Sequence, residues 1–161
     1  MNLKYFNELK KSMEYVSKYK KTIFLGQAVT YPGTAMFNTL KDIDDLKKIE
    51  LPVAEEMQMG ITLGMALKGY VPISVYPRWN FLLSATNQLV NHLDKIKEIS
   101  DNQFNPKIII RTSVGSIRPL NPQCQHIGDF TNFFKKICKN INIVKLNRPS
   151  EIFSSYKKAL L

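Results

Sequence analysis

Short apolar runs alternate with longer stretches of helical periodicity, and this alternation constrains the fold more than any other feature of the sequence. The runs are too short for helices and are bounded by turn-forming residues, so they are predicted to be buried strands. The helical stretches between them supply the crossovers that parallel pairing needs. The sequence therefore predicts a three-layer α/β/α domain, with a mainly parallel sheet covered by helices on both faces.

The predicted strands lie at residues 22–29, 71–76, 107–111 and 141–146. The first helix is predicted from apolar residues at three- and four-residue steps with lysines between them, namely Leu3, Phe6, Leu9, Met13 and Val16.

Further helices are expected between the strands. A short polar helix should precede Leu51, and a long helix should cover residues 81–99. Another should begin near Asp129, which could act as its cap, and Ser150 could cap the last one.

The stretch 55–68 has apolar residues almost all round a helix, so it is predicted to be a buried helix. Gly60 and Gly64 lie one turn apart on the same face. Because glycine costs a helix about 1 kcal/mol relative to alanine, two of them indicate that another backbone or a ligand approaches closely. Gly69 is predicted to end the helix in a left-handed conformation.

The composition is that of a globular domain, with 44% hydrophobic and 22% charged residues. Cys124 and Cys138 match no metal-site spacing and are too few for a disulfide framework, so a reducing, cytoplasmic location is expected. The charged N-terminus lacks the apolar centre of a signal peptide, and no apolar run approaches the roughly 18 residues of a membrane span. We therefore expect a soluble protein that makes no membrane contact.

The net charge of +10 would suit an acidic partner or nucleic acid. However, the lysines are spread over the whole chain and no nucleic-acid-binding motif accompanies them. A solvated basic surface is the simpler interpretation.

Ligands bind parallel sheets at the carboxyl ends of the strands, so a site is expected in the loops after Val29, Tyr76 and Arg111. The sequence has no GxSxG elbow, P-loop, GxGxxG or metal-binding histidine pair. Composition and spacing alone thus predict an α/β domain without specifying its chemistry.

A more specific signal lies in PVAEEMQMGITLGMALKGYVP, at residues 52–72, and in ISVYPRWNFLLSATNQLVNHLDK, which follows directly. This stretch resembles the beta subunits of the thiamine-diphosphate (ThDP)-dependent pyruvate and branched-chain 2-oxo acid dehydrogenases. Their pattern is P-I-S-E, glycines, a proline, an aromatic-N-F and A-x-x-Q-x-x-N. It is matched without a gap by Pro52, Glu55, Gly60, Gly64, Gly69, Pro72, Asn80, Phe81, Ala85, Gln88 and Asn91.

Weaker similarity in FLGQAV and IIIRTSVGS extends the resemblance to about residues 21–160. The implied fold is a single transketolase-like pyrimidine-binding domain over residues 1–161. The second domain of the beta subunits is expected to be absent.

The resemblance implies that Glu55 hydrogen-bonds N1′ of the cofactor's aminopyrimidine and so promotes loss of the proton from thiazolium C2. A carboxyl group kept from water can share a proton with a weakly basic ring nitrogen, whereas a solvated carboxylate stays ionised. Phe81 would pack against the pyrimidine, and Pro77 would line the same pocket. Alternatively, Glu55 simply opens a helix, Phe81 is an ordinary core aromatic and Asn80 is a helix cap.

His126 lies seven residues before Phe133, the spacing at which these beta subunits have an active-site histidine. Histidine suits proton transfer on the substrate side because it can give and take a proton near neutral pH. The serine and glutamine that follow that histidine are replaced here by Ile127 and Gly128, so a surface-loop histidine is the alternative. Gln27 stands where the beta subunits have an acidic residue, which would make its contact with the cofactor uncharged.

The sequence lacks the G-D-G…N motif that holds magnesium and diphosphate in this superfamily. The resemblance therefore implies a separate alpha-like, diphosphate-binding chain that supplies the Mg²⁺ ligands, in a hetero-oligomer. Together they would act on a 2-oxo acid by decarboxylation, or transfer two carbons from a ketose-like substrate. The alternatives are a non-catalytic remnant or regulatory domain of the same fold, and a nucleic-acid binder that only the charge supports.

Overall fold

The structure is a computed structural model that describes residues 3–115, 117 and 121–161. In these residues four parallel strands form one sheet in the order β2-β1-β3-β4. The strands are β1 (Thr22–Gly26), β2 (Lys48–Glu50), β3 (Val71–Val75) and β4 (Ile109–Arg111). Gly26 is in register with Glu50 and Val75, and Val75 with Arg111, so the carboxyl ends are aligned at one edge.

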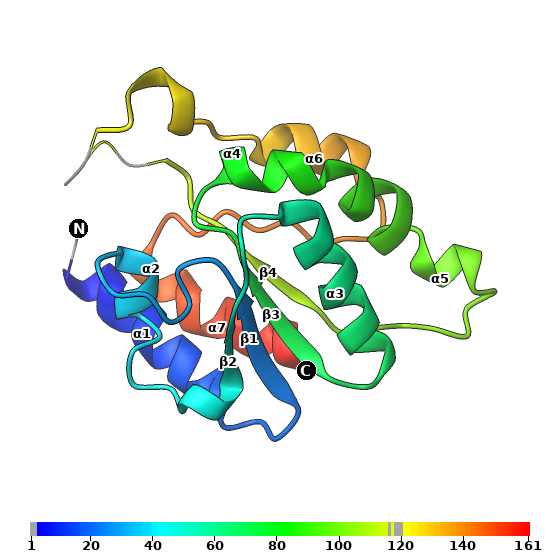
Figure 1. The fold of residues 1–161 in the computed structure, drawn as a ribbon, viewed down its shortest axis with the longest axis horizontal. Coiled ribbons are helices and arrows are strands. Elements are labelled where there is room, and N and C mark those ends of the chain that lie inside the picture. The colour runs from blue at the N-terminus through cyan, green and yellow to red at the C-terminus, as the bar shows by residue number, and fades with distance from the viewer. Residues whose placement is uncertain (1–2, 116, 118–120) are drawn as a thin grey trace.

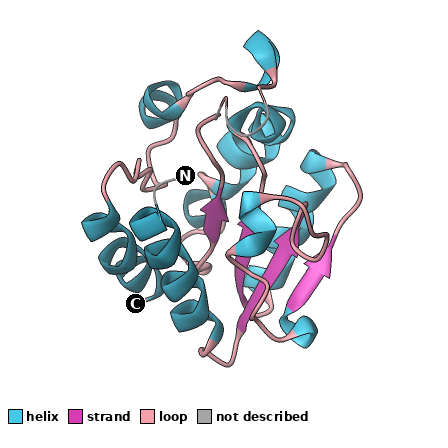
Figure 2. Cartoon of the chain, turned by 90° about the vertical axis from the view of Figure 1, so that its left-hand side faces the viewer, coloured by secondary structure: helices cyan, strands magenta, loops and turns pink. Residues whose placement is uncertain are grey.

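Helices cover both faces of this sheet, which confirms the predicted three-layer architecture (Figures 1 and 2). The α-helices are α1 (Leu3–Ser17), α2 (Ala35–Asn38), α3 (Glu55–Leu67), α4 (Trp79–Leu82), α5 (Ile96–Ile99), α6 (Thr131–Ile137) and α7 (Pro149–Leu160). Short 3₁₀ turns lie at η1 (Asp45–Lys47) and η4 (Gln123–His126). None of the helices described here has the length and apolar character needed to cross a membrane.

Each face of the sheet has its own apolar core. On one face, Met13 of α1 and Ile152 of α7 pack on Phe24 of β1. On the other, Tyr76, Phe134 of α6 and Met59 of α3 are the largest fully buried side chains. The three layers are therefore held by two cores that the strands separate.

Gly26 allows α3 to lie close to the sheet. Its φ of 131° is one that L side chains rarely adopt, and a Cβ there would lie 2.3 Å from the carbonyl oxygen of Val75 and 2.5 Å from Nε2 of Gln58. Gln58 is fully buried, and its amide donates to Oγ of Ser74 and to the Val75 carbonyl, both at 3.0 Å. This close contact places the first residue of α3, Glu55, beside the carboxyl ends of β1 and β3.

The predicted helix at 55–68 ends as expected, because Gly69 has a φ of 84° directly after the C-cap Lys68. The prediction that it is buried all round was wrong. One face packs on β3, but Met57, Ile61 and Leu67 are 45%, 37% and 38% exposed.

The predicted strand at 141–146 was also wrong. Its first backbone N–H, that of Ile141, donates to the buried carboxylate of Asp94 instead of to a neighbouring strand. At its other end, the carbonyl of Leu146 accepts from the hydroxyl of Tyr5 at 2.9 Å. The side chains of Ile141, Ile143 and Leu146 still pack on the two cores. The segment thus keeps its apolar contacts but takes part in no strand pairing.

Conversely, β2 lies in a stretch predicted to be loop and helix. It has three residues, lies at the sheet edge and leaves Ile49 37% exposed, so it has no apolar run to mark it.

The predicted long helix at 81–99 is divided. α4 is followed by a 3₁₀ turn (Leu83–Ala85), a π-helical segment (Gln88–Leu93) and α5. The π-helical turn directs Asp94 inward, where its carboxylate accepts the N–H groups of residues 139–141.

The helix expected near Asp129 is α6, but its N-cap is Phe130 and not Asp129. The Asp129 carboxylate, one residue earlier, accepts the N–H of Thr131 at 3.1 Å. Ser150 does not cap α7, since Pro149 already occupies its first helical position and Arg148 its N-cap.

Candidate cofactor-binding site

Glu55 and Gln27 meet at the carboxyl edge of the sheet. Glu55 opens α3, and Gln27 follows β1, where its own N–H donates to the carbonyl of Val75 at 3.2 Å. Both side chains are only 9% exposed, and Nε2 of Gln27 donates to Oε1 of Glu55 at 3.1 Å. The second oxygen, Oε2, has no hydrogen-bond partner among the described residues. The carboxyl group is therefore buried, with one oxygen held and the other available.

Glu50 organises the loop that carries Gln27, and the sequence analysis missed it. Its Oε1 accepts the N–H of Ala28 at 2.8 Å, and its Oε2 accepts those of Val29 and Thr30, both at 2.7 Å. Ala28 has a φ of 58°, so the loop turns sharply around the carboxylate. An acidic residue at the end of a strand would have been the signal, but β2 itself was not predicted.

The loop after β3 is tied to Glu55 through Tyr76. The Tyr76 hydroxyl donates to the backbone carbonyl of Glu55 at 3.1 Å. Burial raises the pKa of Tyr76 well above its ordinary value, so the hydroxyl remains a donor at neutral pH. The next residue, Pro77, accepts from Oγ of Ser113 at 2.5 Å, and this bond joins the loops after β3 and β4.

Phe81 and His126 form a second pair. Their ring centroids are 5.0 Å apart with planes tilted by 40°. The carbonyl of His126 accepts from Nη1 of Arg78 at 3.0 Å, while its ring Nδ1 is buried without a hydrogen-bond partner in the described residues. Both rings are half-buried.

Asn80 holds the segment that follows His126. Its Oδ1 accepts the N–H of Gly128 at 3.3 Å, and Arg78, not Asn80, occupies the N-cap of α4. The helix-cap alternative for Asn80 is therefore wrong.

The structure thus brings Gln27 to Glu55 and Phe81 to His126, with Pro77 between the two pairs in the chain. Across the residues described, no hydrogen bond or ring contact joins one pair to the other. Tyr76, bonded to the Glu55 carbonyl and covalently linked to Pro77, connects them. Residues 116 and 118–120 of the loop expected to carry the site after Arg111 lie outside the described residues.

Arg111 itself does not face these residues. Arg111 is 6% exposed, and burial lowers the pKa of its guanidinium, an effect that Tyr156 and Tyr5 oppose. Both tyrosines belong to the helices of the opposite face, α7 and α1.

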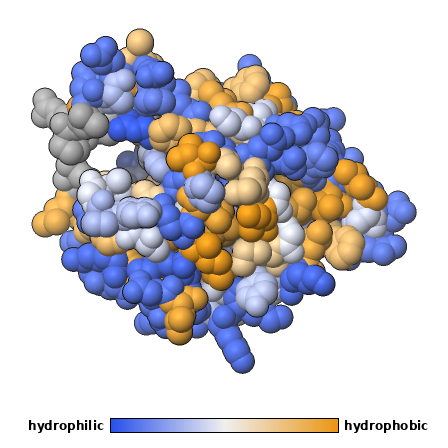
Figure 3. Space-filling view, viewed as in Figure 1, coloured by the Kyte–Doolittle hydropathy of each residue, from blue (hydrophilic) through white to orange (hydrophobic). Residues whose placement is uncertain are grey.

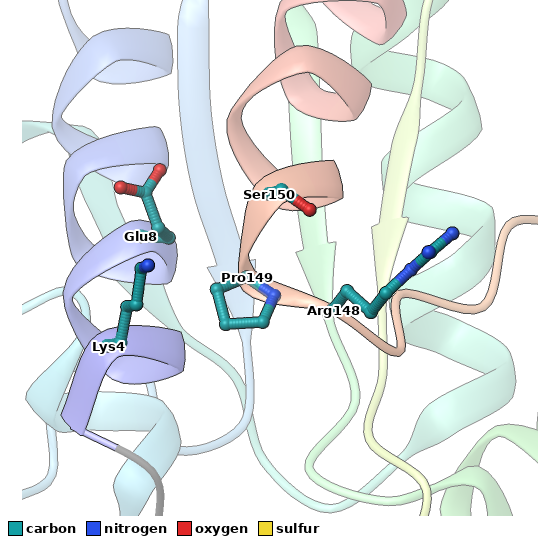
Figure 4. A pocket seen from close by; sticks show the side chains of 5 residues that line it. All are labelled: Lys4, Glu8, Arg148, Pro149 and Ser150. Atoms are coloured by element: carbon teal, nitrogen blue, oxygen red, sulfur yellow. The ribbon is translucent and has the colours of Figure 1, made fainter.

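Metal-binding groups do not cluster in the described part of the chain. No three His, Cys, Asp or Glu side chains there lie close enough to hold a metal ion. A surface hollow of about 350 Å³ lies elsewhere, between α1 and the start of α7, and Lys4, Glu8, Arg148, Pro149 and Ser150 line it (Figure 4).

With this geometry in place, the chain can be compared with known proteins. It is 28% identical over 160 residues to the pyruvate dehydrogenase E1 component subunit beta of Gracilaria tenuistipitata var. liui, covering 96% of this chain and 48% of that protein. It is 33% identical over 116 residues to subunit beta-3, chloroplastic, of Oryza sativa subsp. japonica, covering 72% of this chain and 29% of that protein. The corresponding subunit of Porphyra purpurea is 26% identical over 151 residues, with 91% and 44% covered.

The chain resembles the beta subunit of 2-oxo acid dehydrogenases. It spans about half the length of the Gracilaria relative and less than half the length of the other two. No protein-family model matches the chain.

Proposed function

We propose that this chain is the pyrimidine-binding half of a ThDP enzyme and acts with a separate diphosphate-binding chain. The observation that carries the proposal is the buried Glu55 carboxyl group, which opens α3 with Oε2 unpartnered. The similarity to pyruvate dehydrogenase E1 beta subunits over 96% of the chain supports it. The reaction would be decarboxylation of a 2-oxo acid, or transfer of two carbons from a ketose-like substrate.

The residues present fit an aminopyrimidine ring. Oε2 of Glu55 can accept a hydrogen bond from a protonated ring nitrogen, because only Oε1 is used by Gln27. Gln27 is neutral and fixes the orientation of the carboxyl group without adding a charge. A carboxyl group in this position would share a proton with the ring through that free oxygen.

Phe81 and His126 would contact the face of the pyrimidine ring and the substrate, respectively. The half-buried Phe81 ring can pack on a flat heterocycle, a contact that contributes about 0.5–1.5 kcal/mol beyond burial. The half-buried His126 ring lies against Phe81, and from there it would exchange a proton with a polar group of the substrate.

The partner would supply what this chain lacks. When bound, ThDP provides the carbon acid whose conjugate base attacks the carbonyl of the substrate. Its diphosphate and Mg²⁺ need oxygen ligands, and we assign these to an alpha-like chain in a hetero-oligomer.

Calorimetric titration of ThDP with Mg²⁺ tests this proposal. We expect no measurable binding to the chain alone and binding to a mixture with the alpha-like protein encoded nearest to it. Glu55→Gln should weaken binding about tenfold or more and abolish turnover of 2-oxo acids. The matched control is Glu14→Gln on α1, which lies on the opposite face of the sheet.

A non-catalytic domain of the same fold is the second candidate. The replacement of serine and glutamine by Ile127 and Gly128 after His126 favours it. If no mixture binds ThDP, or if the Glu55→Gln mixture retains full turnover, this candidate replaces the first.

A further inference from the structure

A second surface hollow lies at the amino edge of the sheet, opposite the edge that carries Glu55. Thr22 of β1 is in register with Val71 of β3, so both strands begin at this edge. The hollow measures about 240 Å³. Its polar and aromatic lining residues come from the turns before β1, β3 and β4, namely Tyr19, Lys21, Gly69, Tyr70, Asn105 and Lys107. The length of β1 separates the hollow from the candidate cofactor site by roughly 13 Å, at about 3.3 Å for each residue.

Lys21 places an ammonium group in this hollow. Its Nζ would lie 3.6 Å from a Cβ added at Gly69, so the charge stands over the bare backbone of that glycine. No ion pair or hydrogen bond engages this Nζ among the described residues. Lys107 lines the same hollow, and its Nζ donates to the carbonyl of Leu161. No Asp or Glu is among the described residues that form the lining, so its positive charge is not neutralised there. Hydrophilic side chains also surround the turn between α1 and β1, at the lower margin of the molecule (Figure 3).

The ends of the neighbouring helices do not account for Lys21. A lysine near the end of a helix commonly bonds to the last carbonyl groups, where the helix dipole is negative. At the end of α1 this bond is made by Lys47, whose Nζ donates to the carbonyls of Ser17 at 2.6 Å and Tyr19 at 2.8 Å. At the end of α3 the last carbonyls accept the backbone N–H groups of residues 68–70. The charge of Lys21 is thus available to a group outside the chain.

Two tyrosine rings stand at the same hollow. Tyr19 and Tyr70 are 50% and 47% exposed, and neither hydroxyl has a hydrogen-bond partner in the part of the chain that the structure describes. An exposed aromatic face can pack on a flat heterocycle, and a hydroxyl can donate to an anionic oxygen. Asn105 adds an exposed side-chain amide that makes no hydrogen bond to any described residue. The hollow therefore combines aromatic rings, hydrogen-bonding groups and positive charge.

We propose that this hollow binds a phosphate monoester that carries a flat ring, such as a nucleoside monophosphate. The phosphate contacts the ammonium groups of Lys21 and Lys107, because a lysine binds phosphate as a point charge. The ring packs on the side chains of Tyr19 and Tyr70, and Asn105 bonds to its edge. A hollow of about 240 Å³ is smaller than the roughly 300–1,000 Å³ of sites that enclose a ligand, so the ligand is small and only partly enclosed. The site lies at the other edge of the sheet and does not depend on the proposed function.

Calorimetric titration of residues 1–161 with adenosine monophosphate, adenosine and inorganic phosphate tests this proposal. At low ionic strength we expect the nucleotide to bind at least tenfold more tightly than either fragment, because only the nucleotide uses the charges and the rings together. Its affinity should fall as salt is added, since salt screens exposed charges. In NMR spectra the backbone N–H signals of Tyr19, Lys21 and Tyr70 should shift with the nucleotide. Those of Gln27 and Glu55 should not.

Two pairs of variants separate charge and ring from general effects. Lys21→Glu should weaken nucleotide binding at least tenfold, whereas Lys136→Glu, the same charge change at an exposed position of α6, should leave it unchanged. Replacing Tyr19 and Tyr70 together by leucine should remove the advantage of the nucleotide over phosphate, and replacing both by phenylalanine should retain most of it. Circular dichroism should be unchanged in each variant.

Three results would overturn the proposal. The nucleotide could bind no more tightly than inorganic phosphate, which would leave the rings without a role. Lys136→Glu could weaken binding as much as Lys21→Glu, which would indicate attraction by the net charge alone. The NMR shifts could surround Glu55, which would place the nucleotide at the opposite edge of the sheet.

Discussion

The side-chain amide of Gln27 donates to Oε1 of Glu55 at 3.1 Å, and both groups are buried. A neutral donor beside a buried carboxylate stabilises its charge, whereas a second carboxyl group at the same distance would repel it. This contact therefore predicts what a second acidic residue at position 27 would do to the stability of this chain.

Gln27→Glu should make stability depend on pH. Two carboxyl groups this close repel each other when both are ionised. One of the two apparent pKa values of the pair is therefore higher in the folded chain than in the unfolded chain. Because the folded-state pKa is raised, the variant loses no stability from this repulsion below about pH 4, and the free energy of unfolding falls as the pH rises above that. The loss is about 1.4 kcal/mol for each unit of the pKa shift. Thermal unfolding from about pH 4 to about pH 8 measures it. Gln103→Glu, at an exposed position, should show no such trend.

Glu50→Ala should loosen the loop after β1. The change leaves three backbone N–H groups without their acceptor, and we expect a loss of roughly 1–3 kcal/mol in the free energy of unfolding. Hydrogen exchange at Ala28, Val29 and Thr30 should accelerate, while that of β3 should not. Glu50→Gln keeps one acceptor oxygen, so its stability and its exchange rates should lie between those of the parent chain and of Glu50→Ala. Unchanged exchange in Glu50→Ala would show that the loop is held by other contacts.

Asp94 should contribute to acid sensitivity. Burial alone would raise its pKa, but the backbone N–H groups of residues 139–141 and nearby Lys95 lower it on balance. Because the pKa of Asp94 is lower in the folded chain, its carboxylate stabilises the fold above about pH 3.9, the pKa of an aspartate in the unfolded chain. This stability is lost as the pH falls through the lower pKa of the folded chain.

We therefore expect Asp94→Asn to cost roughly 1–3 kcal/mol at neutral pH, with the difference from the parent chain narrowing in acid. Urea unfolding at several pH values measures it, and Asp101→Asn, at an exposed site, is the control. A constant difference at all pH values would contradict the assigned cause.

The two cysteines should react at very different rates. Cys124 is exposed, whereas burial, followed by the charge of Asp94, raises the pKa of Cys138 to about 11. A thiol reagent near neutral pH should label one cysteine of the folded chain quickly and the second only after unfolding, because the thiolate is the reactive form. Cys124→Ser should remove the fast phase. If that variant still reacts quickly, Cys138 is accessible.

The amino-acid sequence by itself determined the elements whose apolar pattern is local. The stripe of α1, the runs of β1 and β3 and the left-handed Gly69 could all be predicted, because each depends on residues within a few positions of one another. The same holds for Glu55, which a gapless motif placed at the start of α3.

Only the tertiary structure decided the features that depend on distant partners. β2 has too few apolar residues to be recognised without β1 beside it. Residues 141–146 form no strand pairing, and the N–H of Ile141 donates to the distant Asp94 instead. The clamp of Glu50 on Ala28 joins two segments that no local pattern relates. Periodicity shows that a face is apolar but not what covers it. Burial of α3 was therefore overpredicted, and its exposed glycine face emerged only from the packed chain.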